Sequence, residues 1–365
     1  MYFSLTPKSS KENLYDREKE LSKLSEYSKT GRIILITGIR RIGKTSVLKV
    51  FLEQMKDQGH STVFIDCRVY EKINRFDRIS FERKIISEFE DIIQKNRSIF
   101  KVITKINVGG VELNFEKLQK DRNLTGYLEL INKVMKKKNS RLLIAFDEAQ
   151  VLRFYGRGGK ELLNLMAYIY DNLENIVIVL TGSEIGVLHD FLNLEDANSP
   201  LFGRYVHELL LERFQRAESV EFLVEGFKQI GIEPSIGEIE KAVDLLDGII
   251  GYLSIYGYIV STTKDWGNAL QETEKSAIKI VKKELELLRL RSENYISVLK
   301  AVGFGAETFS QVKNFVEARF GSITDQTLSN NLNLLQKMGF LEVNYKNGKK
   351  IYSISDPMIH RAISD

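Results

Sequence analysis

The feature that most constrains this chain is the stretch GIRRIGKT at 38–45, which directly follows the apolar run at 33–36. Two glycines at this spacing let the backbone curl so that successive N–H groups point inward and cradle phosphate oxygens. A helix that starts here adds the positive end of its dipole. Lys44 can reach the β- and γ-phosphates, and the Thr45 hydroxyl can ligate Mg²⁺. The stretch therefore predicts a P-loop, and the predicted phosphate-binding residues are Gly38, Ile39, Arg40, Arg41, Ile42, Gly43, Lys44, Thr45 and Ser46.

Further apolar runs place this loop in a larger sheet. They lie at 61–67, 141–150, 174–183 and, more weakly, 206–211, and amphipathic helical stretches separate them. Runs that are apolar throughout are typical of strands buried on both faces, so we predict a parallel α/β sheet with helices on each side. The chain has 365 residues, which favours two or three domains over one.

The segment between the second and third runs is unusually long. We expect a helix at about 80–95 and then a β-hairpin at 102–115, in which Gly109-Gly110 is a two-residue turn. This hairpin has one apolar face, which must be covered by the main domain, a lid or a partner.

Two acids close the third run. Asp147 ends an apolar strand, where its carboxylate can hold Mg²⁺ near Thr45, and Glu148 follows it directly. We expect Glu148 to polarise an attacking water as general base. Two adjacent acids favour hydrolysis over transfer of a phosphoryl group to a small substrate, because they supply a base for water.

Two further groups have an open role. Thr181 and Ser183 end the fourth run, and Ser183 or Thr181 can hydrogen-bond the γ-phosphate or the lytic water as a sensor. The alternative is a cap between this strand and the next helix. Arg204 precedes the fifth run and can act as an arginine finger, in cis or from a neighbouring subunit. A salt bridge that fixes its loop explains Arg204 equally well.

The rest of the chain changes pattern twice. Residues 212–290 read as four or five helices without a strand, which predicts a helical lid domain. Residues 291–365 read as three short helices and then two alternating strands around Asn347-Gly348, the pattern of a winged helix-turn-helix. We therefore divide the chain into an ATPase domain at 1–211, with an insertion at about 70–125, a lid at 212–290 and a winged helix at 291–365.

These motifs together resemble a known family, the archaeal ATPases of the STAND class (signal-transduction ATPases with numerous domains), close to the AAA+ ATPases. The resemblance covers nearly the whole chain. It is carried by NLYDREKELSKL at 13–24, GIRRIGKTS at 38–46, DEAQ at 147–150, SPLFGR at 199–204 and Asp356-Pro357. It implies the sheet order 5-1-4-3-2, ATP or ADP with Mg²⁺ as ligands, and slow hydrolysis to ADP and phosphate.

The resemblance also implies nucleotide contacts outside the P-loop. Leu14 and Tyr15 would lie beside the adenine, and Arg17 belongs to the same signature. Ile250 stands where the family has a proline that packs near the base and couples the lid to the nucleotide; an isoleucine can pack there, but the fixed turn of a proline is lost. ATP would order the lid over the nucleotide, and hydrolysis would release it.

The winged helix leaves the function open among three classes. Gln326, Asn330, Asn331 and Asn333 of the presumed recognition helix could read bases, but the basic and acidic residues of this domain nearly balance, which is a poor footprint for DNA. A regulatory ATP switch with a protein partner or intramolecular regulation is therefore favoured. The alternatives are an ATP-dependent DNA-binding factor like the archaeal origin-recognition initiators, and a module that only holds nucleotide.

Other features exclude competing classes. A single cysteine, Cys67, permits no internal disulfide and suits a reducing cytoplasm. We expect no secretory signal in the polar first thirty residues and no membrane span. The four histidines lack metal-ligand spacing. The P-loop needs nothing specific at Arg40 and Arg41, so we expect one of them to project toward the helical domain or its acidic groups.

Overall fold

The computed structural model describes residues 1–72, 75–100 and 123–364 and contains a five-stranded parallel sheet in the order β2-β5-β6-β1-β7. The strands are β1 (Ile33–Thr37), β2 (Ser61–Asp66), β5 (Leu142–Asp147), β6 (Ile176–Gly182) and β7 (His207–Leu210). This confirms the predicted order 5-1-4-3-2. The order places β1, which leads into the P-loop, between β6 and β7, and it places β5 between β6 and β2.

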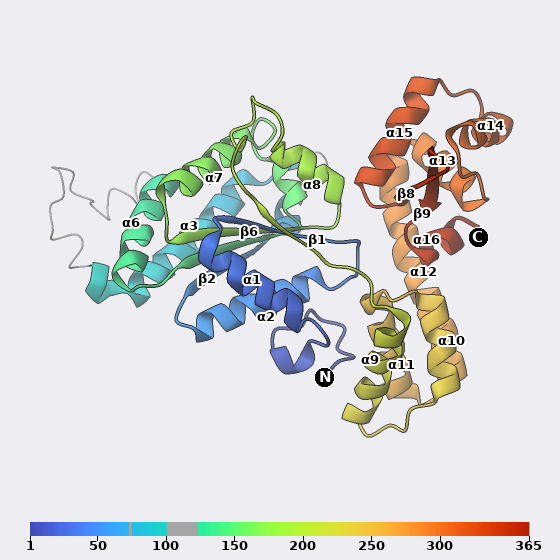
Figure 1. Ribbon diagram of the computed structural model, residues 1–365, viewed down its shortest axis with the longest axis horizontal. Helices are drawn as coiled ribbons and strands as arrows, with labels where there is room; N and C mark the ends of the chain where they lie inside the picture. Colours follow the sequence, from blue (N-terminus) through green and yellow to red (C-terminus); the bar gives the residue numbers. More distant parts are fainter. Residues whose placement is uncertain (73–74, 101–122, 365) are drawn as a thin grey trace.

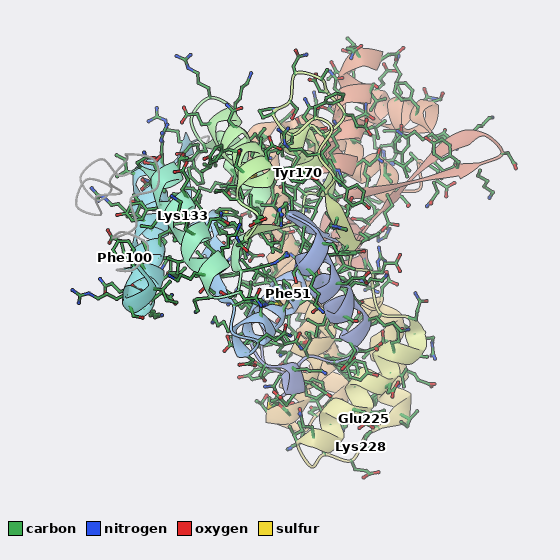
Figure 2. The ribbon with its side chains drawn as sticks, turned by 60° about the vertical axis from the view of Figure 1, so that its left-hand side comes forward. Phe51, Phe100, Lys133, Tyr170, Glu225 and Lys228 are labelled. Atoms are coloured by element: carbon green, nitrogen blue, oxygen red, sulfur yellow. The ribbon has the colours of Figure 1, made fainter. Side chains whose placement is uncertain are left out.

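Helices cover both faces of this sheet (Figure 1). Side chains alternate along β1, so that Ile34 and Ile36 pack with α1 (Glu18–Thr30) and α2 (Lys44–Asp57). The other face of the sheet packs against α3 (Arg78–Lys95), α6 (Leu124–Lys137) and α7 (Lys160–Asn172). Phe51 of α2 is fully buried, and Figure 2 shows it in the interior of this layer. All five strands run the same way, so their carboxyl ends share one edge of the sheet.

Short elements connect this sheet to its helices. They are η1 (Lys11–Asn13), η2 (Cys67–Tyr70), η3 (Ala149–Phe154), α8 (Ile185–Leu192) and the antiparallel pair β3 (Glu71–Lys72) and β4 (Arg75–Phe76). The helix expected at about 80–95 is α3. The hairpin predicted at 102–115 lies outside the described residues.

A helical region follows the sheet. It consists of α9 (Arg216–Gln229), α10 (Ile236–Leu246), α11 (Ile250–Thr263) and α12 (Trp266–Arg291). The 26-residue α12 runs from this region up to the C-terminal part of the chain (Figure 1). Glu225 and Lys228 form an exposed ion pair at the outer end of α9 (Figure 2).

The C-terminal part is a winged helix. Its elements are α13 (Glu293–Gly303), α14 (Phe309–Phe320), α15 (Asp325–Lys337), the hairpin of β8 (Leu341–Lys346) and β9 (Lys349–Ile354), and α16 (Pro357–Ser364). The predicted three helices and hairpin are present. The sequence reading missed α16, which begins at Pro357, a residue suited to the first helical position; the Asp356 carboxylate accepts a hydrogen bond from the Met358 N–H there.

The winged helix contacts the sheet region directly. The C-terminal end of α15 lies against α8, where Lys337 pairs with Asp190 at 2.7 Å and packs on Gly186. A methyl group on Gly186 would lie 2.6 Å from the Lys337 side chain, so this position holds the two helices close together. None of the described helices is long and apolar enough to cross a membrane.

Candidate nucleotide-binding site

A pocket of about 580 Å³ lies where the P-loop, the N-terminal segment and the helical region meet. Its lining includes a set of polar residues and a set of apolar and aromatic residues, which suits a ligand that carries both phosphates and a base. We call the first set, Gly43, Lys44, Thr45, Ser46, Arg68 and Glu148, the polar end, and the second set, Leu5, Leu14, Tyr15, Phe214, Phe222, Ile250 and Ile255, the apolar end.

Two glycines give the P-loop its shape. Gly38 has φ +150°, and a Cβ there would lie 2.6 Å from the Leu211 carbonyl oxygen. Gly43, at the start of α2, has φ +95°, which L-residues rarely adopt, and the nearest atom to a Cβ there would be Ile250 Cγ2 at 3.5 Å. The loop therefore needs glycine at the first position because of crowding and at the second because of backbone conformation.

Lys44 is buried at the floor of this pocket. Its Nζ donates hydrogen bonds to the carbonyl oxygens of Gly38 at 2.9 Å and Ile39 at 2.8 Å. Burial lowers the pKa of Lys44 to about 8, although the nearby charge of Glu148 opposes this shift. Anionic phosphate oxygens would favour the ammonium form, so the site fits such a ligand.

Thr45 and Asp147 meet as the motifs predict. Thr45 Oγ1 donates to Asp147 Oδ2 at 2.9 Å, and Thr181 Oγ1 donates to Asp147 Oδ1 at 2.5 Å. Burial raises the pKa of Asp147, against the lowering effect of the Thr181 hydrogen bond.

A hydroxyl and a carboxylate are ligands that suit Mg²⁺, which usually takes one or two protein oxygens and completes its shell with phosphates and water. Thr45 and Asp147 would hold it. No group of three or more His, Cys, Asp or Glu side chains in the described part of the chain could hold a metal by itself.

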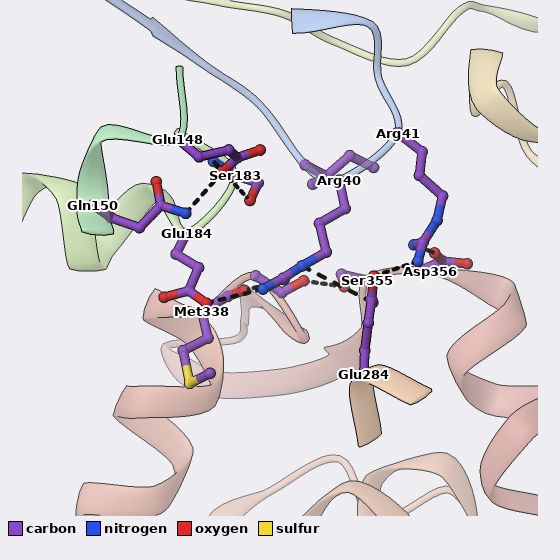
Figure 3. Close-up of polar contacts among 12 residues, drawn as sticks. Arg40, Arg41, Glu148, Gln150, Ser183, Glu184, Glu284, Met338, Ser355 and Asp356 are labelled. Carbon is purple, nitrogen blue, oxygen red and sulfur yellow. Dashed lines mark hydrogen bonds and ion pairs between the residues drawn. The ribbon is translucent and has the colours of Figure 1, made fainter. Parts of the chain in front are cut away.

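Glu148 is held in place by its neighbours. Its carboxylate accepts hydrogen bonds from Ser183 Oγ at 2.7 Å, the Ser183 N–H at 3.1 Å and Gln150 Nε2 at 2.8 Å (Figure 3). Burial would raise the pKa of Glu148, but the Lys44 charge and these hydrogen bonds outweigh it and lower the pKa. Glu148 has φ +53°, a conformation that is strained for a non-glycine residue and is common at functional sites.

This geometry separates the two roles considered for Ser183. The N-cap residue of α8 is Glu184, and no side chain caps that helix. Ser183 instead binds Glu148, and Thr181 binds Asp147 while accepting a hydrogen bond from the Glu148 N–H at 3.1 Å. Both hydroxyls thus orient the acids at the end of β5. Direct contact of Ser183 with a phosphate or water stays a prediction.

The side chains of the two P-loop arginines reach toward α12 and the winged helix (Figure 3). Arg41 Nη2 donates to Glu284 Oε1 of α12 at 2.5 Å, and Arg41 Nη1 lies 3.4 Å from Asp356 Oδ2. Its backbone carbonyl accepts from the Gly251 N–H at 2.9 Å. Tyr252, under the Arg41 guanidinium, donates to the same Asp356 oxygen at 2.7 Å.

Arg40 contacts the winged helix even more directly. Its Nη1 donates to the Met338 carbonyl oxygen at 2.6 Å, its Nη2 to Glu184 Oε1 at 3.0 Å, and the guanidinium lies over the Phe340 ring. The sequence predicts one arginine directed at the helical domain or its acids, and the structure places both in such contacts. Arg40 was also expected to bind nucleotide, but its guanidinium does not line the pocket because it is committed to these partners.

Of the residues implied by the resemblance, some line the pocket, while the side chain of Arg17 is bound to other protein groups. Leu14, Tyr15 and Ile250 line the apolar end, where an adenine contact stays a prediction. Arg17 lines the pocket, but it pairs with Glu20 at 2.7 Å and donates to the Glu212 carbonyl oxygen at 3.0 Å. Ile39 and Gly38 face Lys44 through their carbonyls.

Arg204 differs from the arginine-finger expectation within this chain. It does not line the pocket; its guanidinium makes two hydrogen bonds to the Asp171 carboxylate, at 3.0 and 2.5 Å, and one to the Pro200 carbonyl oxygen at 2.5 Å. These contacts are the loop-fixing salt bridge. A role toward a neighbouring subunit stays a prediction.

Sequence reasoning missed the N-terminal segment and Arg68. Phe3 is fully buried against Gly226 and Gly257, where a Cβ on either glycine would lie 2.3 Å from its ring. The segment then crosses the pocket, and the Lys8 N–H donates to Ser46 Oγ at 3.1 Å. The two aromatic residues at positions 2 and 3 of an otherwise polar segment were the available signal for this anchor.

The presumed recognition helix also needs a correction. Asn331 of α15 is buried, so it cannot read bases in this conformation. It lies on the face of the helix that packs into the core, one turn from Leu328 and Leu335. Gln326, Asn330 and Asn333 are exposed.

Comparison with known proteins agrees with this geometry. Residues 14–255 match a family described as an ATPase domain predominantly from Archaea, and residues 289–355 match the C-terminal winged helix-turn-helix domain of MCM proteins. The Walker-type ATPase paby2304 of Pyrococcus abyssi is 36% identical over 100% of both chains, with a TM-score of 0.85.

A more distant structure shares the fold. The ORC2 protein of Aeropyrum pernix, solved as ADPNP–ADP complexes, is 16% identical over 96% of this chain and 93% of that chain, with a TM-score of 0.61. No curated protein sequence matches this chain. With its AAA+-type P-loop and its MCM-like winged helix, the chain belongs to the family of ATPases found predominantly in Archaea.

Proposed function

We propose that this protein is a slow, Mg²⁺-dependent ATPase that acts as a regulatory switch, in which the nucleotide at the P-loop controls whether the winged helix stays docked. The observation that carries the proposal is that neighbouring residues of the P-loop contact two different parts of the molecule. Lys44 and Thr45 face the pocket, while Arg40 and Arg41 hold the winged helix and α12 (Figure 3).

The chemistry uses groups that are already oriented. Lys44 and the P-loop amides bind phosphate oxygens, and Mg²⁺, when bound, neutralises their charge. Glu148 is ionised at neutral pH because its pKa is lowered, so it can accept the proton of a water that attacks the γ-phosphate. The ORC2 protein of the same fold was solved with ADPNP and ADP, which supports adenine nucleotides as the ligands.

The coupling runs through the backbone of the P-loop. Lys44 donates to the carbonyl oxygens of Gly38 and Ile39, the two residues that precede Arg40. Phosphate oxygens compete for the Lys44 ammonium, so ligand binding removes the donor from two carbonyls of the loop. A shift of this backbone moves the positions from which Arg40 and Arg41 reach their partners.

The partners form a latch, which we define as Arg40, Arg41, Glu184, Glu284 and Asp356. Burial raises the pKa of Glu284, although the charges of Arg41 and Arg40 oppose this shift. Loss of the arginines would therefore leave a largely buried carboxylate without a counter-charge, which is costly. In the proposed switch this contact would alternate between two arrangements, paired and undocked.

Hydrogen exchange tests this proposal together with turnover. ATP hydrolysis by the wild type, and faster exchange of α15 and α8 amides in one nucleotide state than in another, would support the switch. Equal exchange with ADP, with a non-hydrolysable ATP analogue and without nucleotide would contradict it. Nucleotide binding without turnover would leave the binding-only module as the function.

A second candidate is an ATP-dependent DNA-binding factor. It is favoured by the exposed side chains of Gln326, Asn330 and Asn333 on α15 and of Lys346 and Lys349 on the wing, which the docking contacts do not use. The test is a mobility shift on duplex DNA at increasing salt, because phosphate contacts weaken steeply with salt. No shift at low salt would exclude this candidate.

A further inference from the structure

We infer that Arg68 contacts the γ-phosphate of ATP from within the same chain and supplies the positive charge expected of an arginine finger. This inference rests on the proposed function. Arg68 lies in η2, directly after β2, and lines the same pocket as Lys44, Thr45 and Glu148. No motif in the sequence identified it.

Asp66 fixes the Arg68 side chain, which keeps hydrogen-bond donors available for a ligand. Its Nε donates to Asp66 Oδ1 at 3.0 Å, and its Nη2 donates to Asp66 Oδ2 at 2.8 Å. The Asp66 side chain also accepts from the Arg68 N–H at 3.1 Å. Within the described residues, Arg68 Nη1 makes no hydrogen bond, and the side chain is 56% exposed. A fixed guanidinium with open donors is suited to bind a ligand oxygen.

Its position relative to the magnesium ligands points the same way. Arg68 Nη2 lies 3.8 Å from Asp147 Oδ2, the oxygen that accepts the Thr45 hydrogen bond. The reason is the register of the sheet, in which Asp66 of β2 pairs with Asp147 of β5. Arg68 therefore approaches this end of the pocket from the side opposite the P-loop.

The other arginines of the pocket are committed elsewhere. Three arginines line it, Arg17, Arg41 and Arg68. Arg17 is bound to Glu20 and the Glu212 carbonyl, and Arg41 to Glu284 and Asp356. Arg204 is held by Asp171 outside the pocket. Among the described arginines, Arg68 is thus the one that combines a place at the polar end with open donors.

This placement predicts which ligand Arg68 distinguishes. A cation next to Thr45 and Asp147 would reach the terminal phosphate of ATP, a group that ADP lacks. The charge on the γ-phosphoryl oxygens is also what an arginine stabilises during transfer to water. Arg68 should therefore favour ATP over ADP at equilibrium and accelerate hydrolysis.

The test is equilibrium binding, in the presence of Mg²⁺, of ADP and of a non-hydrolysable ATP analogue to the full-length chain. For Arg68→Ala we expect the affinity for the analogue to fall by about tenfold or more and the affinity for ADP by less than about threefold, as for the loss of a charged hydrogen bond. Arg68→Lys should restore part of the preference. Arg75→Ala, an exposed arginine on the neighbouring β4, is the matched control and should keep it.

Two results would overturn the inference. One is an unchanged preference for the analogue in Arg68→Ala; the other is an equal loss of affinity for both nucleotides, which would assign Arg68 to the other phosphates or to the fold. Thermal unfolding of each variant checks the fold. A wild type that binds the analogue through Arg68 but does not hydrolyse ATP would refute the ATPase proposal and leave this inference standing.

Discussion

The two sides of the P-loop differ in what they depend on. On the inner side, from Gly43 to Ser46, Thr45 binds Asp147 at the end of β5, Lys44 binds backbone carbonyls of the same loop, and Ser46 binds the Lys8 N–H of the N-terminal segment. The outer side, Arg40 and Arg41, is completed only by residues that lie more than 140 positions later in the chain. One loop thus contains a phosphate cradle and a set of contacts to α8, α12 and the winged helix.

This difference shows how one loop can line the pocket and also contact distant parts of the chain. The cradle needs glycines, a lysine and a hydroxyl, and it leaves positions 40 and 41 free. Side chains at these positions can therefore be committed to another part of the chain. Variants on the two sides should separate accordingly.

The largest effect is expected on the inner side. Lys44→Ala should abolish measurable nucleotide binding and reduce turnover by about 10³-fold or more, because the β- and γ-phosphates lose their main cation. Isothermal titration with ADP and a phosphate-release assay measure both quantities. ATP binding at wild-type affinity would show that Lys44 does not belong to the cradle.

Glu148→Gln should separate binding from chemistry. The amide keeps the shape but cannot accept a proton, so we expect turnover to fall by about 10²-fold or more with little change in ATP affinity. A single-turnover assay with excess enzyme isolates the chemical step. Undiminished turnover would remove Glu148 from the mechanism.

On the outer side, Arg41→Ala should affect docking before it affects binding. We expect a loss of about 1–3 kcal/mol of unfolding free energy, because Glu284 keeps a raised pKa without its nearest counter-charge. A double-mutant cycle with Glu284→Gln, followed by urea denaturation, measures the coupling. Additive effects of the two substitutions would contradict a direct Arg41–Glu284 contact.

A smaller effect is expected when pH is varied: nucleotide affinity should fall as pH rises above about 8. Lys44 has a lowered pKa of about 8 in the free protein, and phosphate favours its ammonium form, so binding takes up a proton above pH 8. Affinity should fall by up to about tenfold per pH unit above pH 8 and stay flat below it. Lys8, whose pKa burial also lowers to about 8, is the control: Lys8→Met should keep this profile.

The same Lys44 shift has a consequence for the free protein. The unfolded chain, with the ordinary lysine value of 10.5, binds more protons than the folded chain between about pH 8 and 10.5. This group therefore adds stability as pH rises through that window. Denaturation of the nucleotide-free protein should show that Lys44 raises the unfolding free energy as pH increases through this window. A contribution from Lys44 that falls with pH would contradict the lowered pKa.

The smallest effect is expected at Arg204. Its pairing with Asp171 is partly exposed, so breaking it with Asp171→Asn should cost less than about 1 kcal/mol of unfolding free energy. A cost as large as that of Arg41→Ala would remove the contrast between the latch and an ordinary surface pair.

The sequence predicted the parts of this molecule that follow local rules. Strand order followed from the resemblance, and the P-loop from its spacing, while the meeting of Thr45 with Asp147 follows because parallel strands end at one edge. The wing was readable because Asn347-Gly348 is a turn signal. Contacts between distant segments could not be predicted. The acidic partners of Arg41 and the packing of Phe3 against two glycines both depend on how the helical region packs.

Within the site, Arg68 is likewise a residue that the sequence did not predict. Its neighbours in sequence give no motif, and its position in the pocket depends on the pairing of β2 with β5, which brings Asp66 beside Asp147. Asn331 shows the reverse, because a polar residue that suits base reading turned out to face the core.

The central claim is that nucleotide at the P-loop controls docking of the winged helix through Arg40 and Arg41. The direct measurement is the distance between spin labels on exposed positions of α8 and α15, with ADP, with a non-hydrolysable ATP analogue and without nucleotide. The account predicts a distance distribution that changes with the nucleotide in the wild type and is insensitive to it in Arg40→Ala/Arg41→Ala, whose nucleotide affinity is retained. An identical distribution in all wild-type states, or a full response in the double variant, would contradict it.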